Sequence, residues 1–136
     1  MTIHETDSDE SEIPTHRYPY GIKTGQVSTL KTWMDIAVAL SRESTAPDKQ
    51  VGAVAIDINK NVIGYGYNYC VDEDNPSTVD ENGKTKDSTL HAEDEMIHRA
   101  MEMGKNLAGA TIFITHSPCS RCAARLKRAG VKRIYF

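Results

Sequence analysis

The first apolar pattern along the chain has the period of an amphipathic helix. Between residues 28 and 41, apolar or small side chains recur every three to four positions, at Leu30, Trp33, Met34, Ala37, Leu40 and Ser41. Ser28 or Thr29 stands where a helix cap is expected, because its hydroxyl can accept a bond from a backbone N–H of the first turn. We therefore predict a helix that packs one face against a core.

Two stretches rich in β-branched residues follow this helix, after a break at Pro47. Residues 51–57, with the sequence Val-Gly-Ala-Val-Ala-Ile-Asp, predict a buried strand. Residues 62–69 predict a second strand, which pairs antiparallel with the first across a turn at 59–61. Gly64 and Gly66 alternate with large residues in that strand, so we expect another element to pack close to its backbone.

The remaining pattern adds a loop, two helices and two strands. The polar stretch 71–89 is a long loop, and such a loop in a compact domain is usually functional, disordered or both. A helix is predicted from His91 to about Met103, and a strand over 110–115. A further helix has Ser117 as its cap and Pro118 in its first position, ends at Gly130, and precedes a strand over 131–136. This order predicts an α/β fold, with a mixed sheet of four strands flanked by helices.

Length and charge narrow the class of protein. The chain has 136 residues, enough for one domain, and no apolar run reaches the ~18 residues that a membrane span needs. The net charge is −3, but residues 1–13 hold five carboxylates and no Lys or Arg, which leaves residues 14–136 with +2. We interpret 1–25 as an acidic, irregular tail and 26–136 as the functional domain. A net charge of only +2 over residues 14–136 argues against a nucleic-acid partner and fits a small phosphorylated substrate.

Cysteine usage indicates metal chemistry. The three cysteines are an odd number, and two of them form Cys119-Ser-Arg-Cys122. No export signal or membrane segment is recognisable, so we expect a cytoplasmic protein with no membrane partner. The spacing of the pair puts both sulfurs on one face of a first helical turn, where the helix N-terminus favours thiolates. With His91 at the start of another helix, they form a zinc ligand set that leaves the fourth position open for water.

Glu93 follows the histidine by two residues, so its carboxylate need not bind the metal. It is free to take a proton from water that the zinc activates and to return it to a base. His-x-Glu followed by Pro-Cys-x-x-Cys is a known signature of zinc-dependent nucleobase deaminases. We therefore predict Glu93 as the catalytic residue and His91, Cys119 and Cys122 as the ligands of Zn²⁺.

An alternative interpretation of the metal site stays open. Cys70 is either a small apolar filler at a strand end or a fourth zinc ligand. A fourth protein ligand would make the site structural and the protein a non-catalytic binding module. His116 is expected in the wall of the site, and His98 at the surface or in packing. Glu93 beside the three ligands favours the enzyme, because a structural site has no use for that carboxylate.

Over residues 28–136 the sequence resembles the cytidine and deoxycytidylate deaminase superfamily, and within it the deoxycytidylate (dCMP) deaminases. His91-Ala-Glu93 and Pro118-Cys-x-x-Cys122 carry the broad resemblance. The finer resemblance rests on further matches: Trp33-Met34 with Ala37, Ser44-Thr45 leading to Lys49-Gln-Val-Gly-Ala-Val54, Gly66-Tyr-Asn68, and Thr115-His-Ser117. The resemblance implies a three-layer cytidine-deaminase-like fold, whose sheet usually has five strands, and assembly as a homo-oligomer.

The resemblance also implies a reaction and a substrate site. The reaction is the hydrolysis of dCMP to dUMP and ammonia, with Glu93 moving the protons. Asn68 would bind the sugar and the pyrimidine, and the backbone N–H of Ala92 would meet the 2-keto oxygen of the ring. The segment from Ser44 to Gln50 would form part of the phosphate pocket, with Lys49 as its cation. Cytidine, cytosine, a tRNA adenosine and a single-stranded polynucleotide stay open as alternative substrates.

Overall fold

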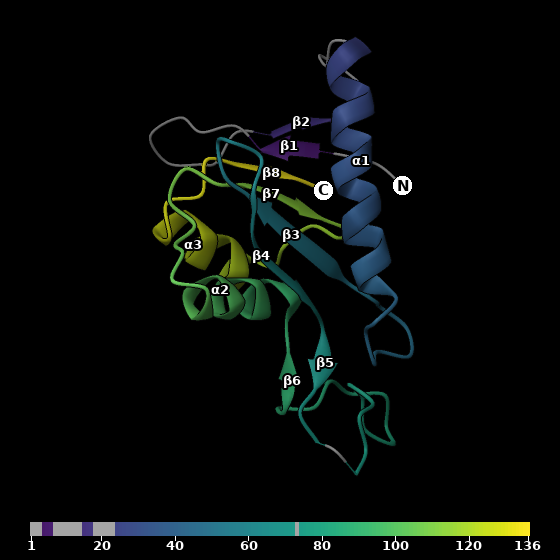
Figure 1. Ribbon diagram of the computed structural model, residues 1–136. Coiled ribbons are helices and arrows are strands. Elements are labelled where there is room, and N and C mark those ends of the chain that lie inside the picture. Colours follow the sequence, from purple (N-terminus) through teal and green to yellow (C-terminus); the bar gives the residue numbers. More distant parts are fainter. Residues whose placement is uncertain (1–3, 7–14, 18–23, 73) are drawn as a thin grey trace.

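The computed structural model describes residues 4–6, 15–17, 24–72 and 74–136, which form three layers (Figure 1). Helix α1 (Thr24–Ser41) covers one face of a central sheet, and α2 (Ala92–Glu102) and α3 (Ser120–Arg128) cover the other. α1 begins at Thr24, four residues before Ser28, the earlier of the two predicted caps. The predicted α/β fold is confirmed. No helix in this part of the chain is long and apolar enough to cross a membrane.

The four strands predicted from the sequence lie side by side in a mixed sheet. They are β3 (Gly52–Ile56), β4 (Val62–Tyr67), β7 (Thr111–Ile114) and β8 (Arg133–Tyr135), in the order β8-β7-β3-β4. β3 pairs antiparallel with both β4 and β7, while β7 and β8 run parallel. β3 is buried along its whole length, in keeping with its apolar sequence.

Two short strands correct the prediction that 1–25 is wholly irregular. β1 (His4–Thr6) pairs antiparallel with β8, and β2 (Thr15–Arg17) pairs with β1, so the described sheet has the order β2-β1-β8-β7-β3-β4. The backbone groups at the edge of β8 can form hydrogen bonds with any extended segment, whatever its side chains. These strands therefore need no apolar pattern, and none was present in the sequence to predict them. Four of the tail's carboxylates lie outside the described residues: Asp7, Asp9, Glu10 and Glu12.

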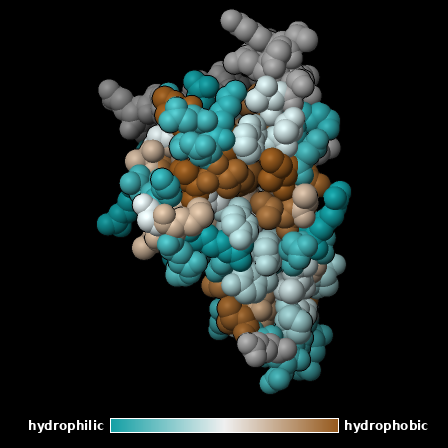
Figure 2. All heavy atoms as spheres, viewed as in Figure 1, coloured by the Kyte–Doolittle hydropathy of each residue, from teal (hydrophilic) through white to brown (hydrophobic). Residues whose placement is uncertain are grey.

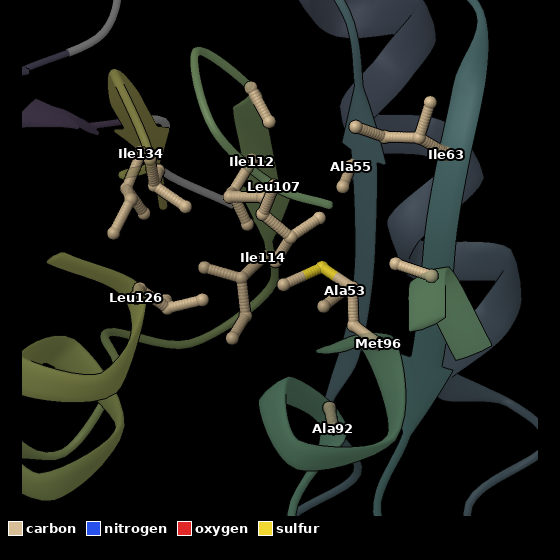
Figure 3. Packing of buried hydrophobic residues seen from close by; sticks show 13 residues of the cluster. Ala53, Ala55, Ile63, Ala92, Met96, Leu107, Ile112, Ile114, Leu126 and Ile134 are labelled. Atoms are coloured by element: carbon tan, nitrogen blue, oxygen red, sulfur yellow. The ribbon is translucent and has the colours of Figure 1, made fainter. Parts of the chain in front are cut away.

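Apolar side chains fill both spaces between the layers, and hydrophobic residues also gather in the middle of the face that Figure 2 shows. Figure 3 shows the larger cluster, in which the sheet packs against α2 and α3, with Ala53, Ile112, Ile114, Met96 and Leu126 among its residues. A second cluster joins the sheet to α1 and consists of Met34, Ala37, Val54, Ile56, Phe113 and Tyr135. Successive residues of β3 and β7 point to opposite faces, so each of these strands contributes to both clusters.

α2 lies close against β4 at two glycines. A Cβ atom on Gly66 would lie 2.3 Å from the carbonyl oxygen of Ala92, and one on Gly64 would lie 2.7 Å from that of Met96. Only glycine fits at such distances, so the crowded strand face predicted from the sequence is confirmed. This contact holds the start of α2, next to His91, against the sheet.

The polar segment after β4 is folded. β5 (Tyr69–Cys70) and β6 (Thr89–Leu90) pair antiparallel and form the stem of a loop that projects from the sheet (Figure 1). Within this loop, Val79 and Thr85 form a bridge, and Asp80 Oδ1 accepts hydrogen bonds from the N–H groups of Asn82 and Lys84. The stem leads directly into His91, so the loop is anchored next to the predicted metal site.

Candidate active site

The predicted metal ligands come together at the starts of two helices. His91 is the N-cap of α2, Cys119 is the N-cap of α3, and Cys122 lies in the first turn of α3. Their ligand atoms all lie within 4.8 Å of one another, and Cys122 Sγ is 3.6 Å from His91 Nδ1. We call these three residues the three-ligand cluster. A tetrahedral metal ion bound by three such donors keeps one position open.

Cys119 caps α3, which corrects the prediction that Ser117 does so. Cys119 Sγ accepts a hydrogen bond from the backbone N–H of Cys122 at 3.4 Å, and the helix begins at Ser120. Serine followed by proline is a frequent helix start, but here the sulfur takes the place of the serine hydroxyl as the capping acceptor. Both sulfurs therefore lie at the N-terminal end of α3, where the backbone N–H groups favour negative charge.

The two thiols of the cluster differ in how readily they ionise. The hydrogen bond from the Cys122 N–H lowers the pKa of Cys119. Burial raises the pKa of Cys122, and the charge of Glu93 raises it further. A divalent cation at the cluster would replace the Cys122 proton and offset the charge of Glu93. Two sulfurs and an imidazole nitrogen fit Zn²⁺ better than cations that prefer oxygen ligands.

Glu93 lies beside the three-ligand cluster without belonging to it. The residue is only 5% exposed, and its charge adds to burial in raising the pKa of Cys122. Cys70 lies apart from the cluster, with its Sγ 3.0 Å from Ser88 Oγ, so the structure does not support a fourth sulfur ligand. A buried carboxylate next to an incompletely coordinated metal is suited to moving protons.

A pocket of about 360 Å³ adjoins the three-ligand cluster. Its lining includes His91, Ala92, Glu93 and Cys119 from the metal site, and Asp48, Lys49, Val51 and Asn68 from the segments around β3 and β4. His116 also lines the pocket, which confirms its predicted place in the wall. The volume is within the range of small-molecule sites.

Asn68 lines the pocket, but its side chain also binds the segment that precedes β3. Asn68 Oδ1 accepts hydrogen bonds from Ser44 Oγ at 2.6 Å and from the Val51 N–H at 2.8 Å, and Nδ2 donates to the Lys49 carbonyl at 2.8 Å. Ser44 is buried and does not belong to the pocket lining. Its hydroxyl is hydrogen-bonded to Asn68 in this structure. Lys49 is exposed in the lining, as a phosphate-binding cation needs to be.

The loop between β5 and β6 contributes a part of the pocket that was not predicted from the sequence. Its residues in the lining are Thr78, Val79 and Thr85, joined by Thr89 of β6. Thr89 Oγ1 donates to the Thr78 carbonyl at 3.1 Å, which ties the loop to the strand before His91. The one signal for these loop residues in the sequence is the length of the polar loop directly before His91. Asp48, which also lines the pocket, lies within the segment 44–50 that the family resemblance assigns to the phosphate pocket.

The fold and the site together form a candidate zinc centre. Two helix starts present one histidine and two cysteines, and a buried glutamate and a pocket adjoin them. Residues 27–136 match the cytidine and deoxycytidylate deaminase zinc-binding region, and the chain belongs to this family.

Two curated relatives are identical to this chain at about a third of the aligned positions. ComE operon protein 2 of Bacillus subtilis (strain 168) is 33% identical over 104 residues, which cover 71% of this chain and 52% of that protein. The deoxycytidylate deaminase of Mus musculus is 31% identical over 114 residues, 76% of this chain and 61% of that protein. The match thus spans about half to three fifths of these relatives. A dCMP deaminase from the cyanophage S-TIM5, solved in complex with dCMP and dUMP, has a TM-score of 0.72 and 27% identity over 76% of each chain.

Proposed function

We propose that this chain converts dCMP to dUMP and ammonia by zinc-dependent hydrolysis. The observation that carries the proposal is one pocket that contains Glu93 and two of the metal ligands together with Lys49. Such a pocket can hold a pyrimidine ring at the metal while a lysine meets the phosphate. The similarity to deoxycytidylate deaminases in sequence and in structure supports this substrate class.

Glu93 moves the protons in this proposal. A zinc ion held by His91, Cys119 and Cys122 would make water acidic enough to act as a nucleophile at neutral pH. As the water oxygen adds to carbon 4 of the cytosine, Glu93 accepts a proton from the water and passes it to the adjacent ring nitrogen. Glu93 then delivers the second proton to the amino group, the carbon–nitrogen bond breaks, and ammonia leaves uracil behind.

Other pocket residues orient the nucleotide. Ala92 is the first residue of α2, and the first N–H groups of a helix have no partner within it. In our proposal the Ala92 N–H donates to the 2-keto oxygen of the ring. Lys49 meets the phosphate, and Asn68 keeps a second amide N–H, beyond the one bound to the Lys49 carbonyl, for the sugar.

A substrate panel tests the proposal. Zinc-loaded protein is incubated with dCMP, CMP, dCTP, deoxycytidine, cytosine, a tRNA and single-stranded DNA, and ammonia release is measured. We expect the highest kcat/KM for dCMP and a much lower one for deoxycytidine, which offers Lys49 no phosphate. Folded, zinc-loaded protein that releases no ammonia from dCMP contradicts the proposal. Preferred turnover of a tRNA adenosine or of single-stranded DNA, with a steep salt dependence, would assign the site to nucleic acid.

Glu93→Gln is the matched variant for the catalytic step. Glutamine keeps the shape of the side chain but cannot accept a proton, so we expect kcat to fall by about 10²–10⁴-fold. Zinc content is expected to stay at the wild-type ratio, because Glu93 is not one of the cluster's ligands. A variant that has lost its zinc, or that turns over at the wild-type rate, contradicts the assigned role.

We also propose that the protein forms a homo-oligomer, in keeping with its family resemblance. In the described sheet β8 is covered by β1, and the two outer strands are β2 and β4, so self-association through a sheet edge would use one of these two strands. Light scattering after size-exclusion chromatography, over a range of protein concentrations, measures the number of subunits. A monomer at every concentration contradicts this proposal.

A further inference from the structure

The three metal ligands come from two helices that are only weakly joined to each other. α2 packs chiefly on β4, and few contacts link it directly to α3. His91 begins α2, whereas Cys119 and Cys122 begin α3. The spacing of the ligands therefore depends on any side chain that connects the first turns of the two helices.

Asp94 makes such a connection. It lies in the first turn of α2, three residues after His91, and its Oδ1 accepts a hydrogen bond from Arg125 Nη1. Its Oδ2 lies 3.6 Å from Arg121 Nη2. Arg121 directly precedes Cys122 in the first turn of α3, and Arg125 follows one turn later, in the last turn of this short helix.

The exposures of these side chains suggest a contact made at the helix interface. The side chain of Asp94 is 21% exposed, against 50% for Arg125 and 60% for Arg121. The carboxylate is thus largely withdrawn from water, while the arginines reach it from the solvent side. Figure 1 shows α2 and α3 next to each other on the same side of the sheet.

We propose that Asp94 is a positioning residue of the metal site. Its carboxylate, bound to Arg121 and Arg125, fixes the start of α3 against the start of α2 and thereby the distance between His91 and the two cysteines. The role concerns the metal and holds whichever nucleotide the pocket takes.

A positioning role and a merely structural one predict different measurements. Partly exposed ion pairs contribute little to global stability, so a structural role predicts a small change in the melting temperature and none in zinc affinity. Groups that orient metal ligands change metal affinity by about 10–100-fold. Because Asp94 acts through helix placement and not through a bond to a ligand, we expect the lower end, about tenfold.

Asp94→Asn is the test variant, and Glu102→Gln is its matched control. Glu102 is the last residue of α2, at the opposite end of the helix from His91. Its exposed carboxylate is 2.8 Å from His98 Nε2. Zinc dissociation constants are measured by competition with a chromogenic chelator, and the unfolding of each metal-free protein is recorded. We expect a dissociation constant about tenfold higher for D94N and an unchanged one for E102Q, with similar unfolding of both metal-free variants.

A second variant removes the same contact from the α3 side. Arg125→Gln should weaken zinc binding as D94N does, and the double variant should be no weaker than the worse single variant, because both remove one interaction. The spectrum of the cobalt-substituted protein should change in D94N and stay unchanged in E102Q. If D94N and R125Q bind zinc as tightly as the wild type, the proposal is wrong. Because zinc binding needs no turnover, this result is independent of the dCMP assay.

Discussion

Ser44 Oγ lies 2.6 Å from Asn68 Oδ1 and donates a hydrogen bond to it, across 24 residues of sequence. Asn68 also binds the backbone of Val51 and Lys49 through the same side chain. Ser44 Oγ in turn accepts the N–H of Ala46 at 3.1 Å. The segment that carries Lys49 to the pocket is therefore held in place by an asparagine that itself lines the pocket.

Ser44→Ala tests whether this hydrogen bond positions Lys49. The variant removes a buried hydroxyl without touching the pocket lining, and the lost bond should lower the free energy of unfolding by about 1 kcal/mol. We expect KM for dCMP to rise severalfold with little change in kcat, because the segment around Lys49 is less well fixed. Steady-state kinetics with dCMP and with deoxycytidine measure the effect. An equal rise in KM for both substrates would argue that the hydrogen bond does not position Lys49, since deoxycytidine has no phosphate for Lys49.

Gly66→Ala should disturb the metal site through the backbone of α2. The new Cβ would lie 2.3 Å from the Ala92 carbonyl oxygen and 2.8 Å from the Met96 nitrogen, so the start of the helix has to move. We expect a loss of about 1–3 kcal/mol in the free energy of unfolding, as in other overpacked cores, together with weaker zinc binding. Urea unfolding and chelator competition measure the two effects.

Gly83→Ala is the control for that variant. Gly83 has φ +78° and no atom near its Cβ position, so alanine introduces backbone strain in an exposed turn without displacing α2. We expect some loss of stability and an unchanged zinc affinity. Zinc binding by the Gly66 variant at the wild-type affinity would mean that the close approach of β4 and α2 does not position His91.

Zinc should stabilise the folded chain. A ligand that binds only the folded state adds about 2.7 kcal/mol to the free energy of unfolding when its free concentration is 100 times the dissociation constant. We expect the melting temperature to rise with zinc and to fall again with a chelator, while magnesium has no effect because the donors are sulfur and nitrogen. His91→Ala should lose most of the rise. A melting temperature that does not respond to zinc contradicts the assignment of the cluster.

The elements and the ligands were predictable because their signals are local. The strand at 51–57 is recognisable from its own apolar residues, and the ligands are recognisable from the short motifs around His91 and Cys122. The structure contains both the strand and the three-ligand cluster. The partner of Ser44 was not predictable, because Asn68 meets it only after β3 and β4 have paired. Thr78 and Thr85 reach the pocket only through the folding of a loop with no periodicity. The cap at Cys119 depends on a sulfur that ordinary capping preferences do not include.

Zinc affinity should increase with pH across the neutral range. Burial, and then the charge of Glu93, raise the pKa of Cys122, so the metal-free protein keeps this thiol protonated, and zinc must displace the proton. Chelator competition between about pH 6 and about pH 8 should therefore show weaker binding at the acid end, and calorimetry in buffers of different ionisation enthalpy should show proton release. The same shift predicts that the metal-free protein loses stability as pH rises above the ordinary thiol pKa, because only the unfolded chain then ionises this thiol. Zinc affinity that does not depend on pH would mean that no buried thiol is deprotonated on binding, and Cys122 would not be a ligand.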